Sequence, residues 1–183
     1  MSTADSVIPG EETREGAFRL WINSLGLPGT APIENLSDDL KTGITFLKII
    51  EKLVPGRVDW SRVQKDPGPG PRRHHVCISN CSYLIDLCRD PKLGLSVVGI
   101  GGVDIAEGQQ KFVLALLWQL MRSSSLKMVK EMNARKFGGD AKVDDQALIK
   151  WANDRVAKAG KNSRMKSFRG RLFILCLLVF LLA

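Results

Sequence analysis

The sequence predicts an all-α fold, in which a helical bundle is followed by one extra helix and an apolar tail. Apolar residues recur every three or four positions along most of the first 121 residues, which is the spacing of one helix face. Glycines and prolines follow these runs and end them, as they end helices. The 183 residues are enough for one ordinary domain with its own core, plus a fragment.

The first predicted helix covers residues 11–25. Residues 1–10 before it are small, polar and turn-prone, and we expect them to be disordered. Within the helix, Trp21 and three further apolar residues share one face, so Trp21 is a candidate core residue. Gly26 and Pro28 end the helix.

The second predicted helix covers residues 38–54, with Ser37 or Asp38 as its N-cap and Pro55 at its end. Gly43 lies in its middle, where glycine costs about 1 kcal/mol relative to alanine. We therefore expect Gly43 to be a structural residue that lets a neighbouring helix come close.

The third predicted helix, over residues 76–90, follows a loop rich in proline and glycine. Cys77 and Cys81 lie one turn apart, with His74 and His75 just before them, which raises the question of a zinc site. Structural zinc sites need a second pair of ligands, and the sequence offers none. We therefore favour small apolar core residues over a metal site, and no nucleophile, base and acid combine into a catalytic set.

The stretch GLSVVGIGGVDIAEG at residues 94–108 superficially resembles a dinucleotide-binding loop. Asp104 stands where the third glycine of that motif belongs, and its carboxylate would repel a pyrophosphate. No lysine follows in the position that a phosphate-binding loop requires. The sequence predicts no cofactor, but a tight turn in which Asp104 is the N-cap of a long helix and Glu107 completes a capping box.

This long helix is apolar on two faces, so it is either central to a domain or partly a binding surface. The face that we assign to the core consists of Leu114, Leu117, Trp118 and Met121. The second face consists of Val113, Leu116 and Leu120. It is either a contact surface, with Lys111 and Arg122 at its edge, or buried under another helix.

Positive charge is concentrated at the end of the chain. Residues 1–121 contain 13 Lys and Arg against 14 Asp and Glu, whereas residues 122–183 contain 14 against 5. A basic tail of this kind suits an anionic filament, a nucleic acid or a lipid surface, or is simply a solvated linker. The chain holds four cysteines and no N-terminal apolar run of the signal-peptide kind, so we expect a reducing, cytosolic environment.

Three separated segments carry a family resemblance: FRLWINSL, LSDDLKTGITFLKIIEKLVPGRVDW and GIGGVDIAEGQQKFVLALLWQLMR. Together they resemble the calponin-homology fold. NCSYLIDLC and VVGIGGVDIAEG, followed by LALLWQLMR, resemble the fimbrin and plastin actin bundlers, in particular the leading domain of their second actin-binding tandem. In this motif Asp104, Gly108 and Trp118 are structural residues.

The resemblance implies a domain organisation. It places the calponin-homology domain at residues 11–124, a linker at 125–142 and the first helix and loop of an incomplete second domain at 143–170. Asp144 or Asp145 favours the start of that helix. An apolar tail at 171–183 remains, too short at 12 apolar residues to span a bilayer. This tail is a product of altered splicing or a shifted frame, a partner for the helix at 143–157, or an anchor in one leaflet.

The resemblance also implies a function: binding to F-actin in the cytoskeleton, without catalysis and with no nucleic acid as partner. In such tandems the filament contacts come from the first and last helices of the leading domain and from the first helix of the next. The candidate contact residues are therefore Arg14, Arg19, Lys111, Val113, Leu116, Leu120, Arg122 and Lys150. Calcium regulation has no basis, because no EF-hand loop is present.

Two other functions stay open. Calponin-homology domains also serve as microtubule or signalling adaptors, and the basic residues before the tail favour an anionic membrane surface as a partner of residues 155–183.

A bundling protein needs two filament sites, and this chain offers one and a fraction.

Overall fold

A computed structural model describes residues 11–137 and 144–158, together with residues 160, 162, 164 and 166. These residues are helical and contain no strand, which confirms the all-α prediction. The chain divides into two compact units, Ile22–Ser124 on the one hand and Met1–Trp21 with Ser125–Ala183 on the other. The expectations for residues 1–10 and for the tail at 171–183 lie outside the described residues.

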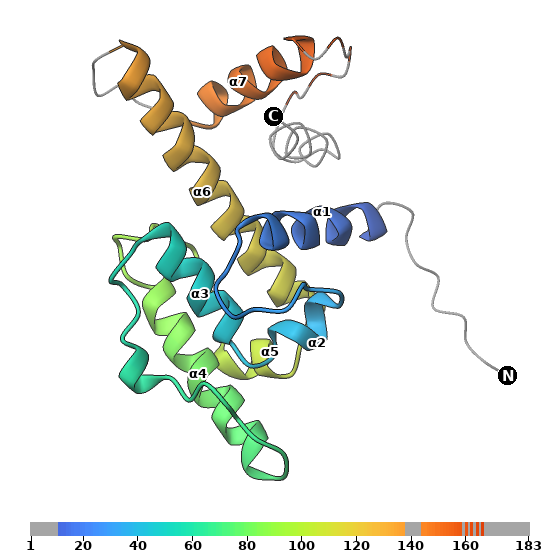
Figure 1. The fold of residues 1–183 in the computed structure, drawn as a ribbon, viewed down its shortest axis with the longest axis vertical. Helices are drawn as coiled ribbons and strands as arrows, with labels where there is room; N and C mark the ends of the chain where they lie inside the picture. Colours follow the sequence, from blue (N-terminus) through green and yellow to red (C-terminus); the bar gives the residue numbers. More distant parts are fainter. Residues whose placement is uncertain are drawn as a thin grey trace, which may run out of the picture. The chain divides into compact units, whose positions relative to one another are not determined.

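Seven α-helices and one short 3₁₀ helix make up the described chain (Figure 1). They are α1 (Glu11–Ser24), α2 (Leu36–Leu40), α3 (Ile44–Leu53), η1 (Trp60–Arg62), α4 (Arg72–Cys88), α5 (Gly102–Ala106), α6 (Gln110–Phe137) and α7 (Asp145–Lys158). The helix predicted over residues 76–90 starts four residues earlier than expected, directly after the proline of the preceding loop.

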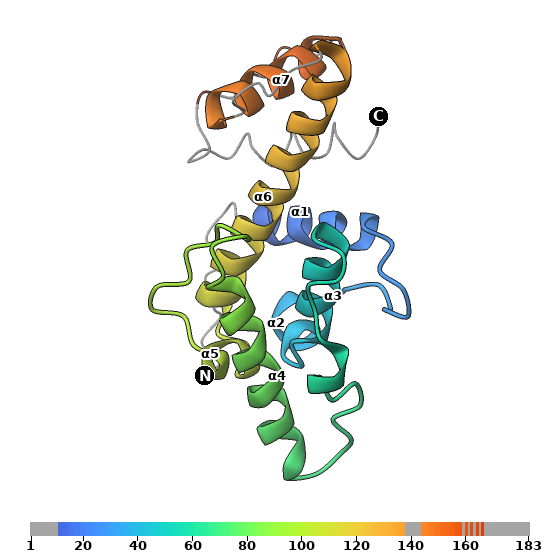
Figure 2. The ribbon, with the colours of Figure 1, turned by 90° about the vertical axis from the view of Figure 1, so that its left-hand side faces the viewer.

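Helix α4 is the centre of the unit Ile22–Ser124. It contacts α3 on one side and carries α5 across it, as the two ribbon views show (Figures 1 and 2). Seven of its residues are buried, on more than one face: Cys77, Asn80, Cys81, Tyr83, Leu84, Ile85 and Cys88. The polar members of such a buried set must be paired within the protein.

Asn80 is the polar exception in this core, at 1% exposure. Its amide nitrogen donates to the carbonyls of Thr42 and Gln64, at 3.3 and 3.0 Å, and its amide oxygen accepts from the Gln64 N–H at 3.2 Å. A buried amide is tolerated when its donors and acceptors are paired in this way. Asn80 thereby ties two connecting segments to α4.

The helix predicted over residues 38–54 is broken into α2 and α3 at Gly43. This glycine has φ +73°, a left-handed conformation in which only glycine is unstrained. A Cβ at this position would lie 3.0 Å from the Cys81 sulfur and 3.2 Å from the Cys81 nitrogen. The expected close approach of a helix is therefore confirmed, and that helix is α4, but Gly43 breaks the predicted helix instead of continuing it.

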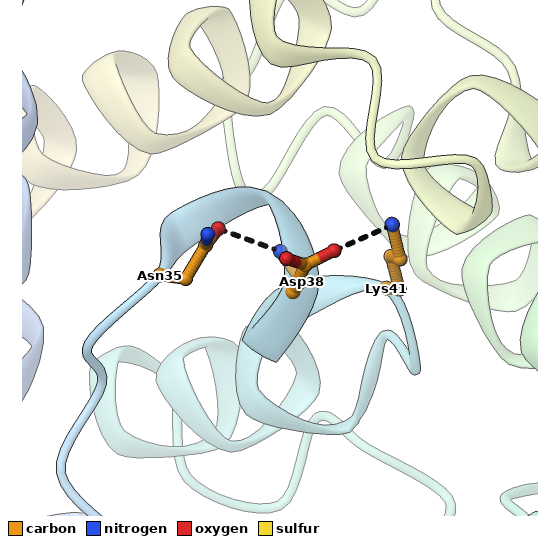
Figure 3. Close-up of polar contacts among 3 residues, drawn as sticks. All are labelled: Asn35, Asp38 and Lys41. Carbon is orange, nitrogen blue, oxygen red and sulfur yellow. Dashed lines mark hydrogen bonds and ion pairs between the residues drawn. The ribbon is translucent and has the colours of Figure 1, made fainter.

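The N-cap of α2 is Asn35 and not the predicted Ser37 or Asp38. The Asn35 side chain accepts a hydrogen bond from the Asp38 N–H at 3.0 Å. Lys41 pairs with the Asp38 carboxylate at 2.6 Å across one turn (Figure 3). Because this ion pair is exposed, it stabilises the helix by at most about 1 kcal/mol.

The predicted linker at 125–142 is helical up to Phe137, because α6 continues through it. Helix α7 follows at Asp145–Lys158, where an amphipathic helix was expected. The Asp144 carboxylate accepts from the Ala147 N–H at 3.0 Å and so caps the start of α7. Ile149, Ala152 and Val156 form its buried face.

Candidate functional site

The first half of α6 carries most of the candidate site, and Gly108 sets where this helix begins. Gly108 has φ +70°, and a Cβ there would lie 3.0 Å from the Ser37 carbonyl oxygen and would collide with the Lys41 side chain. The turn between α5 and α6 thus passes directly over α2. This close approach explains why glycine is required at position 108.

Asp104 is a capping residue, but of a different helix from the one predicted. It is the third residue of α5, and its carboxylate accepts from the Gly101 N–H at 2.7 Å. The long helix begins only at Gln110, so Asp104 is not its N-cap. Glu107 ends α5, and its carboxylate accepts from the Gln109 side chain at 3.2 Å instead of completing a capping box.

The glycine-rich loop before α5 is attached to α6 by Gln119. The Gln119 side-chain oxygen accepts from the Ser96 N–H at 2.5 Å, and its nitrogen donates to the Ser96 carbonyl. The backbone N–H and carbonyl of Ser96 in this loop are therefore already paired with a side chain of the protein. It supports the prediction of a structural turn over that of a nucleotide-binding loop.

The apolar stripe predicted as a contact surface is buried. The side chains of Val113, Leu116 and Leu120 are 1%, 0% and 1% exposed. The contact-surface prediction is therefore wrong for these three residues, because they cannot reach a partner while they form the core. The alternative that they are buried is confirmed.

The exposed side of this half of α6 is instead formed by Lys111, Ala115, Trp118 and Arg122. Their spacing of four, three and four residues places them in line on one helix face, opposite Leu116 and Leu120. We call these four residues the α6 stripe. Lys111 and Ala115 are exposed, and Trp118 and Arg122 are half-buried.

The α6 stripe combines aromatic surface with positive charge. The Arg122 guanidinium lies 5.9 Å from the centre of the Trp118 ring, and the Lys111 ammonium lies 5.5 Å from that of Phe112. Both distances allow a cation–π interaction. Trp118 was assigned to the core with Leu117 and Met121; those two are buried, but Trp118 is not fully covered.

A signal for the exposed face of α6 was present in the sequence. Lys111 and Arg122 lie eleven residues apart, so they share one side of a helix, and two cations indicate its exposed side. The predicted core face includes Trp118 instead, and it is rotated by about one residue from the buried face. Ala115, between the two cations, is not among the candidate residues that the sequence predicts.

The remaining candidates lie in the other unit. Arg14 and Arg19 are exposed on α1, as is Leu20 at 49%, whereas Trp21 is buried at 3% as predicted for a core residue. Lys150 is exposed on α7. All three cations are exposed, and their role stays a prediction.

The cysteines of α4 belong to the core, as predicted. Cys77, Cys81 and Cys88 are free thiols at 5%, 0% and 0% exposure. Burial raises the pKa of Cys81 and of Cys88 to about 12, so both stay protonated and unreactive near neutral pH. Within the described residues, no group of three or more histidine, cysteine or acidic side chains could hold a metal ion.

No helix among the described residues is long and apolar enough to cross a membrane. The three explanations of the tail at 171–183 concern residues outside this part of the chain.

Comparison with known proteins gives a family and a set of relatives. The calponin homology (CH) domain family model matches residues 12–125. Fimbrin-3 of Arabidopsis thaliana is 34% identical over 157 residues, plastin-3 of Homo sapiens 35% over 167, and fimbrin of Saccharomyces cerevisiae 39% over 159. These alignments cover 86%, 91% and 86% of this chain but 21%, 25% and 24% of those proteins. The chain thus spans about a quarter of their length.

The crystal structure of the actin-crosslinking core of Schizosaccharomyces pombe fimbrin is similar to this fold, with a TM-score of 0.65 and 31% sequence identity. The similarity covers 94% of this chain and 35% of that one. The resemblance to calponin-homology domains, and to fimbrins and plastins among them, is confirmed.

Proposed function

Since this chain belongs to the calponin homology domain family, we propose that it is an F-actin-binding module that attaches to filaments through surface helices and carries out no catalysis. The observation that carries the proposal is the similarity to the actin-crosslinking core of fimbrin, which extends over nearly the whole chain. The proposal places the protein at the actin cytoskeleton.

The α6 stripe is the filament contact that the geometry favours in the unit Ile22–Ser124. Interface cores are enriched in tryptophan and arginine, and Trp118 and Arg122 lie next to each other with part of their surface accessible. Lys111 adds an exposed cation at the N-terminal end of the stripe. Such a surface suits an acidic filament.

We assign a second set of contacts to α1 and α7, through Arg14, Arg19 and Lys150. Residues 11–124 are then the calponin-homology domain, and residues 143–170 correspond to the first helix and loop of the next one. The alignments with relatives support this division, since they extend beyond the 12–125 match to as many as 173 residues.

The test is cosedimentation of the full chain with F-actin, at low and at physiological salt. The wild-type protein should enter the pellet with the filaments. The double variant Lys111→Glu/Arg122→Glu should bind about tenfold more weakly, because each reversal replaces an attraction to an acidic partner by a repulsion. The control Arg72→Glu/Lys92→Glu changes the net charge equally, at exposed positions outside the stripe, and should bind within about twofold of wild type.

The outcomes are distinguishable. Wild-type protein that stays in the supernatant at both salt concentrations contradicts actin binding, and pelleting with microtubules alone would replace it by the microtubule function. If wild type binds and both double variants bind equally well, the module binds actin through a surface other than the α6 stripe.

A further inference from the structure

A groove of about 680 Å³ runs along one face of α3, separate from the α6 stripe. Ile44, Lys48 and Lys52, spaced by one helix turn each, line its length. This spacing extends about 12 Å along the helix, which equals about four residues of extended chain. Pro28 and Trp60 add apolar surface from the segments on either side of α3 in the sequence.

The groove is held open by the protein's own polar contacts. The Lys48 ammonium donates to the carbonyls of Pro28 and Gly29, at 2.8 and 2.9 Å, and to the Thr30 hydroxyl at 2.9 Å. These bonds fix the loop after α1 beside α3, where Figure 2 shows it. Ligand sites are usually largely pre-formed, and three bonds from one ammonium keep this loop in place without a ligand.

The one acidic residue that lines the groove is also used for its construction. The two carboxylate oxygens of Glu51 accept from the N–H groups of Gly56 and Val58, at 2.7 and 3.0 Å. These backbone hydrogen bonds hold the pKa of Glu51 below its usual range, so it stays ionised and paired. Its charge is turned toward the backbone after α3.

Two cations of the groove are left for a partner. Lys52 and Lys65 are both exposed, and among the described residues neither forms an ion pair with a carboxylate. The Lys65 ammonium lies 5.8 Å from the centre of the Trp60 ring, so charge and aromatic surface meet at one place. The groove thus combines an apolar lining from Ile44 and Trp60 with two cations, Lys52 and Lys65, that form no ion pair within the described part of the chain.

We propose that this groove binds a short acidic peptide segment in extended conformation. An apolar side chain of the peptide rests on Ile44 and Trp60, and its carboxylates pair with Lys52 and Lys65. The lining residues of the groove extend about 12 Å along α3, which favours an extended chain over a compact headgroup, and the charge selects acidic sequences over basic ones. This site goes beyond filament binding, since it shares no residue with the α6 stripe, α1 or α7.

The test is a titration of the full chain with an end-blocked pentapeptide of two aspartates, one leucine and two glutamates, up to about 2 mM. Nitrogen-15 NMR follows the Trp60 indole N–H, assigned with a Trp60→Phe variant, and the backbone of α3. Saturable shifts at Trp60, Ile44 and Lys52 are expected. A peptide with lysines in place of the acids, and one with serine in place of leucine, should each bind at least about tenfold more weakly.

The matched variants decide whether the groove is the site. Lys52→Glu/Lys65→Glu should weaken binding of the acidic peptide at least about tenfold, while Arg72→Glu/Lys92→Glu stays within about twofold of wild type. Absence of saturable shifts, shifts that lie outside the groove, or equal binding of the basic peptide would overturn the proposal. So would flotation with phosphatidylserine vesicles that depends on Lys52 and Lys65 in a protein that does not bind the peptide.

Discussion

Single glycines decide how closely the helices of the unit Ile22–Ser124 approach one another. At Gly43, Gly102 and Gly108 a Cβ would meet atoms of α4 or α2 at 3.0 Å or less. The sequence predicted a close approach at Gly43, because glycine is costly inside a helical run. It could not predict the partner helix, because that depends on tertiary packing.

Asn80 is a residue whose structural role the sequence pattern did not indicate. Its neighbours Cys77 and Cys81 attracted the metal hypothesis, while a lone asparagine in a helical pattern usually indicates an exposed position. In the structure it is the most extensively paired polar side chain of the described core, with three hydrogen bonds to two connecting segments. Those partners lie 16 and 38 residues away, so periodicity carries no signal for them.

Gly102→Ala is expected to destabilise the fold by about 2 kcal/mol. A Cβ at this position would lie 2.5 Å from the Ser82 nitrogen and 2.7 Å from its Cα, and a backbone cannot move aside as a side-chain end can. The measurement is the free energy of unfolding in urea. Gly16→Ala on α1 is the control: its Cβ meets nothing within 4 Å, so the variant should be up to about 1 kcal/mol more stable.

The double variant Gly102→Ala/Ser82→Ala separates backbone from side-chain collision. Because the hydroxyl is only one of the three atoms met, its removal should restore less than half of the lost stability. Full recovery would mean that α5 is free to shift on α4.

At the scale of elements, the helices were predictable where one face is buried. The predicted ends at residues 25 and 54 agree with α1 and α3 within one residue. Residues 125–137 were expected to be a linker because their apolar spacing fades, yet they belong to α6. Apolar periodicity indicates which residues are buried. A helix that continues beyond the core of its domain keeps its backbone hydrogen bonds although this periodicity is absent.

The same reasoning explains why the predicted core face of α6 is rotated from the observed one. Seven apolar residues lie on two faces of this half of the helix, so the pattern alone permits two choices of core face. Burial of Val113, Leu116 and Leu120 resolves the choice, and it moves the candidate surface to the side of Trp118.

Leu116→Ala is therefore expected to act on stability. Leu116 is fully buried, so its truncation removes packing and leaves a cavity, at a cost of about 3 kcal/mol in the free energy of unfolding. Leu20→Ala, at a 49% exposed position, should change it by no more than about 0.5 kcal/mol. Chemical denaturation followed by circular dichroism measures both. A loss below about 1 kcal/mol for Leu116→Ala would mean that this side chain is not part of the core and is again a candidate contact residue.

At the scale of the whole molecule, valency limits what filament binding can achieve. The α6 stripe provides one proposed filament contact, and crosslinking needs two sites that engage different filaments at the same time. The excess of positive charge in residues 122–183 adds attraction to an acidic filament, but this attraction weakens with salt.

We therefore expect the chain to bind filaments without bundling them at physiological salt. After centrifugation at high speed the protein should pellet with F-actin, whereas at low speed, which collects only bundles, the filaments should remain in the supernatant. Two copies joined by a flexible linker should pellet filaments at low speed, because the second binding event becomes intramolecular with the first. Bundles formed by the single chain would mean that it self-associates, which sedimentation velocity without actin would detect. In that case the valency comes from an interface between copies and not from the α6 stripe.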